Sequence, residues 1–202
     1  GIANVVDDST PQLGGNLDLN SNNITGTGNL DIANGTIKLD GNYPTGTDNV
    51  ALGDTALDSV EAGGTNNTAI GNHSGTAITT GDYNTAVGSL SLESNTTAGN
   101  NTAIGGASLR CNTTGVDNTS VGSGALNTNT TGNYNSALGR SALAANTTAH
   151  RNTGLGYFAL NANTTGSCNT SVGFAALDFN TTGSNNTAVG QGALFCNTTA
   201  SN

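Results

Sequence analysis

The amino-acid sequence predicts an all-β fold, a parallel β-solenoid or β-roll made of 17-residue coils. Three observations lead to this fold class. A motif that ends in glycine recurs at a fixed spacing, and the chain is poor in both large hydrophobic and charged residues. Leucine and alanine do not recur at the 3.6-residue spacing of a helix. Stacked coils suit such a chain, because backbone hydrogen bonds and ladders of small residues replace a thick core.

The repeat is the pattern Asn-x-small-aliphatic-Gly. It occurs nine times, first after an interval of 18 residues and then at seven intervals of 17. Its glycines form the glycine row: Gly53, Gly71, Gly88, Gly105, Gly122, Gly139, Gly156, Gly173 and Gly190. Leucine follows four residues later in eight of the nine units, and Asn-Thr-Thr follows seven residues later in seven units. Features that stay in phase in this way predict one coil per unit, with two short strands and two turns. The Asn-Thr-Thr turn is expected to contain the residues with positive φ.

Large aliphatic residues at two phases of the repeat are predicted to form the core. The aliphatic row precedes each glycine, and the leucine row follows it. The core residues expected from the two rows are Val87, Leu92, Ile104, Leu109, Val121, Leu126, Leu138, Leu143, Val172, Leu177, Val189 and Leu194.

A third phase, the small row, holds only Ala, Ser or Gly. Residues that alternate along a strand point to opposite faces, so the small row is expected to face away from the aliphatic row. A face restricted to small side chains suggests close approach of another chain. The predicted inter-chain face is Ala86, Ala103, Ser120, Ala137, Gly154, Ser171 and Ala188. One coil buries too few large side chains to offset the ordering of its backbone. We therefore expect an intertwined or side-by-side homotrimer, with a dimer or a monomer as the alternatives.

Two regions are expected along the chain. Residues 49–202 contain the nine repeats, and the last repeat stops part-way, which suggests a longer parent protein. Residues 1–48 lack the repeat, but Asn16–Asn20 and Asn29–Ala33 read as short alternating strands. This first segment is predicted to be a joint or a β-prism, or else a less regular cap of the solenoid.

Composition excludes several classes of function. The net charge is −9 with only four Lys and Arg residues, so no basic patch offers a nucleic acid a binding surface. No run of 18 apolar residues occurs, so membrane insertion is not expected. The only histidines, His73 and His150, lie in different phases, and the carboxylates are scattered. We therefore expect no metal, no cofactor and no enzymatic activity.

Cysteine spacing argues against disulfide bonds within the chain. Cys111 and Cys196 share a phase but lie five coils apart, about 24 Å at the spacing of paired strands. Cys168 lies in another phase, more than one coil from either. A disulfide requires the two Cα atoms to lie within about 7 Å of each other, so three free thiols are expected.

The repeat also resembles known fibre proteins. The run Asn-Thr-Ala-Val-Gly with Ala-Leu and Asn-Thr-Thr-Gly, as in residues 180–194, resembles repeats of bacteriophage tail fibres. It is also similar to the head repeats of trimeric autotransporter adhesins, which are left-handed parallel β-rolls with a shorter unit. The opening Pro11–Asn20 looks like segments common in tail fibres of phages that infect marine bacteria.

The resemblance favours a structural shaft of a phage tail fibre that serves host attachment. Its expected partners are further copies of the chain, other virion tail proteins and host surface polysaccharide, and its expected location is the virion. The alternative is a bacterial surface adhesin head that binds host matrix or cells.

Two further features of the sequence bear on function. Recurrent Asn-x-Ser/Thr sequons, among them Asn112 and Asn163, allow a glycosylated extracellular filament as a third hypothesis, although Asn and Thr that stabilise a turn explain the spacing equally well. The aromatic residues Tyr157, Phe158 and Phe174 are candidates for contact with a sugar. Packing between coils or between chains is the alternative role for these rings.

Overall fold

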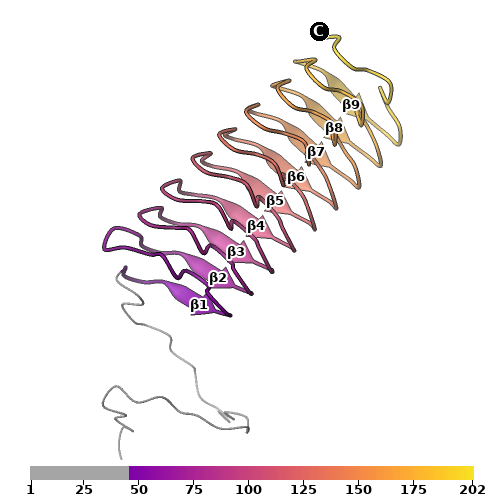
Figure 1. Ribbon diagram of the computed structural model, residues 1–202. Coiled ribbons are helices and arrows are strands. Elements are labelled where there is room, and N and C mark those ends of the chain that lie inside the picture. Colours follow the sequence, from indigo (N-terminus) through magenta and orange to yellow (C-terminus); the bar gives the residue numbers. More distant parts are fainter. Residues whose placement is uncertain (1–45) are drawn as a thin grey trace, which may run out of the picture. The chain divides into compact units, whose positions relative to one another are not determined.

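In the computed structural model, the described residues 46–202 form a parallel β-solenoid of about eight turns with 17-residue coils (Figure 1). The β segment expected over residues 1–48 lies, except for its last three residues, outside the described part of the chain.

Each coil contributes one three-residue strand, and all nine strands lie in a single parallel sheet in the order of the sequence. The register keeps each strand opposite the equivalent residues of the next, as in Thr102↔Thr119 and Ile104↔Val121. The strands are β1 Val50–Leu52, β2 Thr68–Ile70, β3 Thr85–Val87, β4 Thr102–Ile104, β5 Thr119–Val121, β6 Ser136–Leu138, β7 Thr153–Leu155, β8 Thr170–Val172 and β9 Thr187–Val189.

The rest of each coil is turn rather than the second strand that the sequence predicted. Backbone hydrogen bonds nevertheless continue from coil to coil outside the sheet. The Leu109 N–H donates to the Ala125 carbonyl at 3.0 Å, and the Thr113 N–H donates to the Thr130 carbonyl at 2.9 Å. Coils are therefore joined on several sides, and the sheet is only one part of the ladder.

The positions with positive φ differ from those expected. Asn112 and Thr113, in the Asn-Thr-Thr turn, do not have positive φ, whereas Leu109 has a φ of 51°. Every leucine of the leucine row shares this left-handed conformation, which is uncommon for a bulky residue. It bends the chain after the strand so that the leucine side chain enters the coil.

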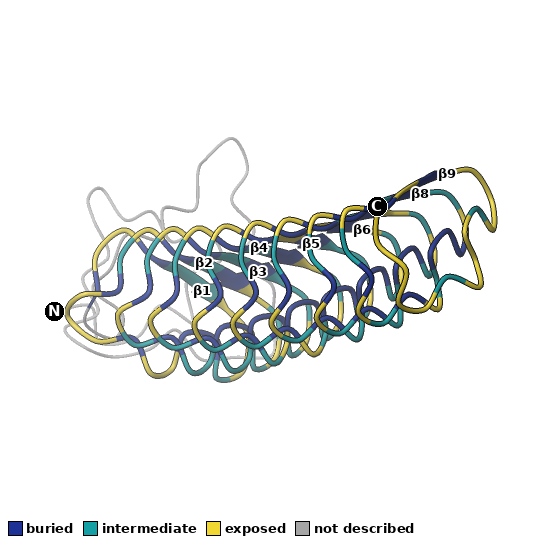
Figure 2. Ribbon diagram, turned by 90° about the horizontal axis from the view of Figure 1, so that it is seen from above, coloured by how far each residue is buried: buried dark blue, intermediate teal, exposed yellow. Residues whose placement is uncertain are grey.

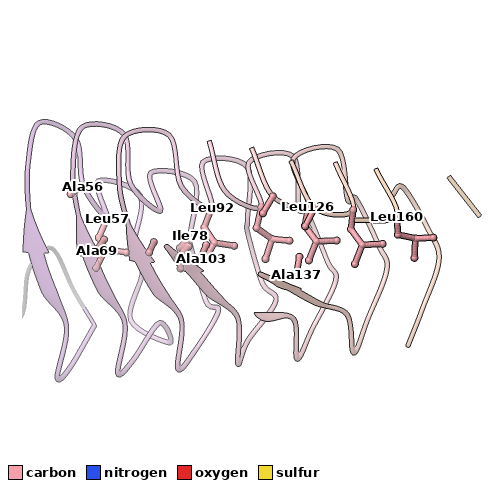
Figure 3. Packing of buried hydrophobic residues seen from close by; sticks show 14 of the residues in the cluster. Ala56, Leu57, Ala69, Ile78, Leu92, Ala103, Leu126, Ala137 and Leu160 are labelled. Atoms are coloured by element: carbon pink, nitrogen blue, oxygen red, sulfur yellow. The ribbon is translucent and has the colours of Figure 1, made fainter. Parts of the chain in front are cut away.

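The interior is a line of leucine and small side chains (Figure 3). Residues of the leucine row from Leu92 to Leu177 have no exposed surface, which confirms that half of the predicted core. Leu194 lies in the last coil and is 49% exposed. The second coil has Gly75 where leucine is expected, and Ile78 fills the space beside it.

The predicted orientation of the strand faces was wrong. The small row is buried inside its own coil: Ala86 is 1% exposed, Ala103 has no exposed surface, and Ala137 is 1% exposed. The remaining members, Ser120, Gly154, Ser171 and Ala188, are buried as well. The small row therefore cannot be a contact surface for another chain. Its side chains are small because the inward-pointing leucines leave little space opposite them.

The aliphatic row consequently lies on the outside. Ile104 is 39% exposed, Leu138 is 50% exposed and Val189 is 69% exposed, while Val87, Val121 and Val172 are partly exposed. Figure 2 shows this separation of buried interior and exposed outer corners along the stack. These six residues, predicted as core, form an outer apolar ridge instead.

Two columns of asparagine complete the interior. The Asn135 N–H donates to Asn118 Oδ1 at 2.9 Å, and Asn118 Nδ2 donates to the Gly132 carbonyl at 2.8 Å. In the second column, Asn129 Nδ2 donates to Asn112 Oδ1 at 2.9 Å. The buried amides thus bond both to backbone and to one another, and among the described residues no buried side-chain polar atom lacks a partner.

Candidate functional surfaces

The outer face of the sheet carries two parallel rows. The aliphatic row runs beside a threonine row, in which Thr85, Thr102 and Thr119 are typical members. None of the strand residues from β1 to β9 is charged. Leu138 and Leu155 stand on one side of a shallow groove of about 260 Å³, with Ser136 and Thr153 on the other. The face therefore presents an apolar ridge and, next to it over β5 to β7, an apolar groove.

Three side chains predicted to contact a sugar do come together, with Arg140 beside them. Tyr157 and Phe174 stack at 5.5 Å between ring centroids with an interplanar angle of 5°, and Phe158 lies 4.1 Å from Tyr157. Arg140 Nη1 donates to the Tyr157 hydroxyl at 2.8 Å, and its guanidinium lies 5.6 Å from the centre of that ring. Both faces of Tyr157 thus have protein neighbours, so this ring offers a sugar only its edge. Packing between coils, the alternative role, describes Tyr157, whereas Phe174 is stacked on Tyr157 and is 54% exposed.

A hollow of about 390 Å³ lies between the glycine row and the Asn-Thr-Thr turns of three consecutive coils. We call it the turn-side hollow. Its lining is Gly124, Asn127, Thr128, Ser141, Ala144, Ala145 and Asn161. The sequence interpretation missed it. An alignment of the repeats would have shown it. Ala144 stands where an earlier coil has Arg110, and Ala145 stands where a later coil has Phe179.

The two histidines have different surroundings. His150 Nδ1 accepts a hydrogen bond from the Asn133 N–H at 2.9 Å, in a column where Asn133 Oδ1 likewise accepts from the Val116 N–H at 2.7 Å. His73 lies on another side of the coil with a φ of 53°. Among residues 46–202, no group of three His, Cys, Asp or Glu residues is placed to hold a metal ion.

The sequon asparagines are structural. Asn95, Asn112, Asn129, Asn146, Asn163 and Asn180 have no exposed surface. Asn163 Nδ2, the atom that a glycan would modify, donates to the Gly166 carbonyl at 2.9 Å and to Asn146 Oδ1 at 3.0 Å. A glycan has no room at these positions in the folded chain. Asn197 in the last coil is partly exposed, but its Nδ2 donates to Asn180 Oδ1 at 3.0 Å. Stabilisation of the turn accounts for the repeated sequon.

Charged groups are few and separate. Arg110 Nε donates to Glu93 Oε2 at 2.6 Å across adjacent coils, and this contact raises the pKa of Arg110 above its ordinary value. Burial raises the pKa of Asp178, while a hydrogen bond from Asn161 opposes that shift. Cys111, Cys168 and Cys196 are free thiols.

Within residues 46–202 there is no helix of the length and hydropathy needed to cross a bilayer. Comparison with known proteins adds no family: no family model matches the sequence, and no curated protein or solved structure is significantly similar to it.

Proposed function

We propose that this chain is part of the structural shaft of a phage tail fibre, which holds a receptor-binding region away from the virion. The observation that carries the proposal is the unbroken, in-register stack of nine strands. Backbone and asparagine hydrogen bonds repeat in successive coils, as expected of a rod that transmits load along its length. The repeat motifs of residues 180–194 resemble those of phage tail fibres, which also supports the proposal.

The outer strand face supports assembly of the shaft as a homotrimer. Leu138 and its equivalents form a ridge, and the adjacent groove lies over β5 to β7. The ridge of one copy can fit the groove of another. A two-fold pair would use the same face, so the choice of three copies rests on the resemblance of residues 180–194 to the repeats of trimeric fibres. Copies aligned in parallel would keep every coil in register, and the absence of charge on the strands removes repulsion between like faces.

Other virion tail proteins are the partners proposed for the two ends of the shaft, and host surface polysaccharide is the partner proposed for attachment. A bacterial surface adhesin head is the second candidate function. The turn-side hollow favours it, because an adhesin of this kind would bind along its side. Both candidates use the same assembled rod.

The oligomeric state provides the first test. We expect a mass of about 59 kDa in solution by light scattering, three times the 19.8 kDa of one chain, and rods in electron micrographs. Replacing Leu138 by Glu should dissociate the trimer, because in that layer it would place an unpaired carboxylate in the apolar groove at each contact. The matched control is Thr131→Glu, at an exposed position outside the strand face. A wild-type monomer at tens of micromolar, or a Leu138→Glu trimer, would contradict this interface.

The location provides the second test. An antibody raised against the chain should label the tails of viral particles by immunoelectron microscopy. Label confined to bacterial envelopes would support the adhesin and refute the fibre.

A further inference from the structure

We propose that the turn-side hollow binds a short, uncharged oligosaccharide segment along the rod. The site is formed by three consecutive coils of one chain and does not involve the strand face proposed for assembly. It is therefore expected to stay open in the fibre and in the adhesin alike.

The hollow exists because small residues interrupt columns of larger ones. In one column, Arg110 and Asn127 precede Ala144, and Asn161 follows it. In a second column, Gly124 and Ser141 precede Phe158. The small side chains leave a depression of about 390 Å³, which lies within the range of ligand pockets, about 300–1,000 Å³.

Polar groups stand at both ends of the depression. Asn127 and Asn161 share a column and are two coils apart, so their Cα atoms are separated by roughly 10 Å at the spacing of paired strands. Between them lie the methyl groups of Ala144 and Ala145 and the hydroxyl of Ser141.

Asn127 Nδ2 donates to the Ala107 carbonyl at 3.0 Å and the Asn161 side chain bonds to Asp178, so their amide oxygens are the groups offered to a ligand. These acceptors at the ends and the methyls on the floor match a sugar, which has hydroxyl groups around its rim and C–H groups on its faces.

Phe158 lies beyond the lining, next to it along the rod. It occupies the coil after Ser141 in the same column, and its contact with Tyr157 fixes its ring. Unlike Tyr157, Phe158 is not stacked in parallel on another ring. Phe158 is thus the aromatic residue available for a sugar at that end of the hollow, while Tyr157 and Phe174 support it.

The uncharged lining of the hollow favours an uncharged ligand. All seven lining residues are uncharged. The nearest arginines are engaged: Arg110, in the column of Asn127, bonds to Glu93 at 2.6 Å, and Arg140 bonds to the Tyr157 hydroxyl. A phosphate or sulfate would lose its hydration here without gaining a cationic partner. The hollow therefore suits neutral glycans better than anionic ones.

Filling the hollow tests the proposal on the full 202-residue chain. Ala145→Phe places in the hollow the residue that Phe179 provides at the same phase, so the coil accommodates it. Ala77→Phe makes the same change at the same phase outside the hollow and is the matched control. A second variant, Ala144→Arg, reproduces Arg110 at its phase. The probes are hexaoses of maltose, cellulose, xylan and chitin, with a hyaluronan hexasaccharide as the anionic comparison, measured by saturation-transfer NMR and titration calorimetry.

We expect at least one neutral hexaose to bind, with contacts at the Phe158 ring. Its affinity should fall about tenfold or more in Ala145→Phe and Ala144→Arg and stay within about twofold of wild type in Ala77→Phe. Unchanged circular dichroism would show that the variants fold. The proposal is overturned if no neutral hexaose binds, if hyaluronan binds better, or if the filled variants bind as the wild type does.

Discussion

Gly105 is stacked so closely on Gly122 of the next coil that a side chain cannot fit between them. A β-carbon added to Gly105 would lie 2.7 Å from the carbonyl carbon and 2.8 Å from the carbonyl oxygen of Gly122. Gly105 also has a φ of 125°, a conformation that residues with a side chain rarely adopt. The positive φ recurs at every member of the glycine row, and the overlap recurs from Gly53 to Gly173, which explains why no other residue occupies these positions.

Gly105→Ala should therefore destabilise the solenoid by about 3 kcal/mol or more, since backbone strain and steric overlap act together. The neighbouring Gly106→Ala is the matched control. Gly106 has no positive φ, and the nearest atom to its added β-carbon is the Ser89 carbonyl oxygen at 4.0 Å. Chemical unfolding followed by circular dichroism compares the two. Equal effects at the two positions would contradict the stacking argument.

Substitution of Asn118 tests how much the buried asparagine column contributes to stability. Its side chain makes four hydrogen bonds, with Asn101, Gly132, and both the N–H and the Nδ2 of Asn135. Asn118→Ala removes all four, so we expect a loss of about 3–4 kcal/mol in the free energy of unfolding, at about 1 kcal/mol per bond. Asn72 is exposed, and its Nδ2 makes only a 3.5 Å contact with Asp54 Oδ2. Asn72→Ala is therefore the control and should change the free energy of unfolding by less than about 0.5 kcal/mol.

Hydrogen exchange adds a local readout to this comparison. Amides of the coils around Asn118 should lose protection in Asn118→Ala, because coils depend on their immediate neighbours. A uniform change along the rod, or none, would argue against a local ladder.

The sequence was sufficient to predict the solenoid and its period. These follow from the spacing of the glycine row, because each strand ends at the same motif. The sequence was not sufficient to predict which face of each strand points into the coil. Alternation along Thr102-Ala103-Ile104 says only that the middle residue faces away from its neighbours. Which side is the interior depends on where Leu109 points, and this follows from a left-handed backbone conformation that leucine rarely adopts. The turn-side hollow was missed for a related reason, since it arises from residues that are small in only some coils.

Ala137→Leu distinguishes an interior small row from an inter-chain one. Because Ala137 is 1% exposed in its own coil, a larger side chain overpacks the interior and should cost about 1–3 kcal/mol. This loss should not depend on protein concentration, since it arises within one chain. Thr131→Leu, at an exposed position outside the strand face, is the control and should leave the coil intact. Thermal unfolding at several concentrations separates the two cases. A loss that vanishes on dilution would restore the inter-chain interpretation.

Asp178 makes stability depend on pH in a direction opposite to that of most carboxylates. Burial raises its pKa above the ordinary value of 3.8, and the hydrogen bond with Asn161 only partly offsets this. The folded chain therefore holds the proton more tightly than the unfolded chain. Stability from this group is lost as the pH rises through the window just above 3.8. Asp178→Asn should be more stable than wild type at pH 7 and should lose that advantage at pH 3. Unfolding midpoints at the two pH values check the sign, and a larger advantage at pH 3 would refute it.

His150 serves as a hydrogen-bond acceptor, and substitutions at its position can separate this role from simple packing. Its Nδ1 accepts from the Asn133 N–H, so the neutral tautomer with hydrogen on Nε2 fits the site. The next residues in the same column, Ser167 and Ser184, accept through their hydroxyl oxygens from the N–H of His150 and Ser167. His150→Ser should therefore keep the bond and fold with nearly wild-type stability, whereas His150→Leu should lose about 1 kcal/mol. Amide exchange at Asn133 is the decisive measurement. Faster exchange is expected in His150→Leu only, and equal protection of Asn133 in both variants would show that the imidazole contributes nothing beyond its bulk.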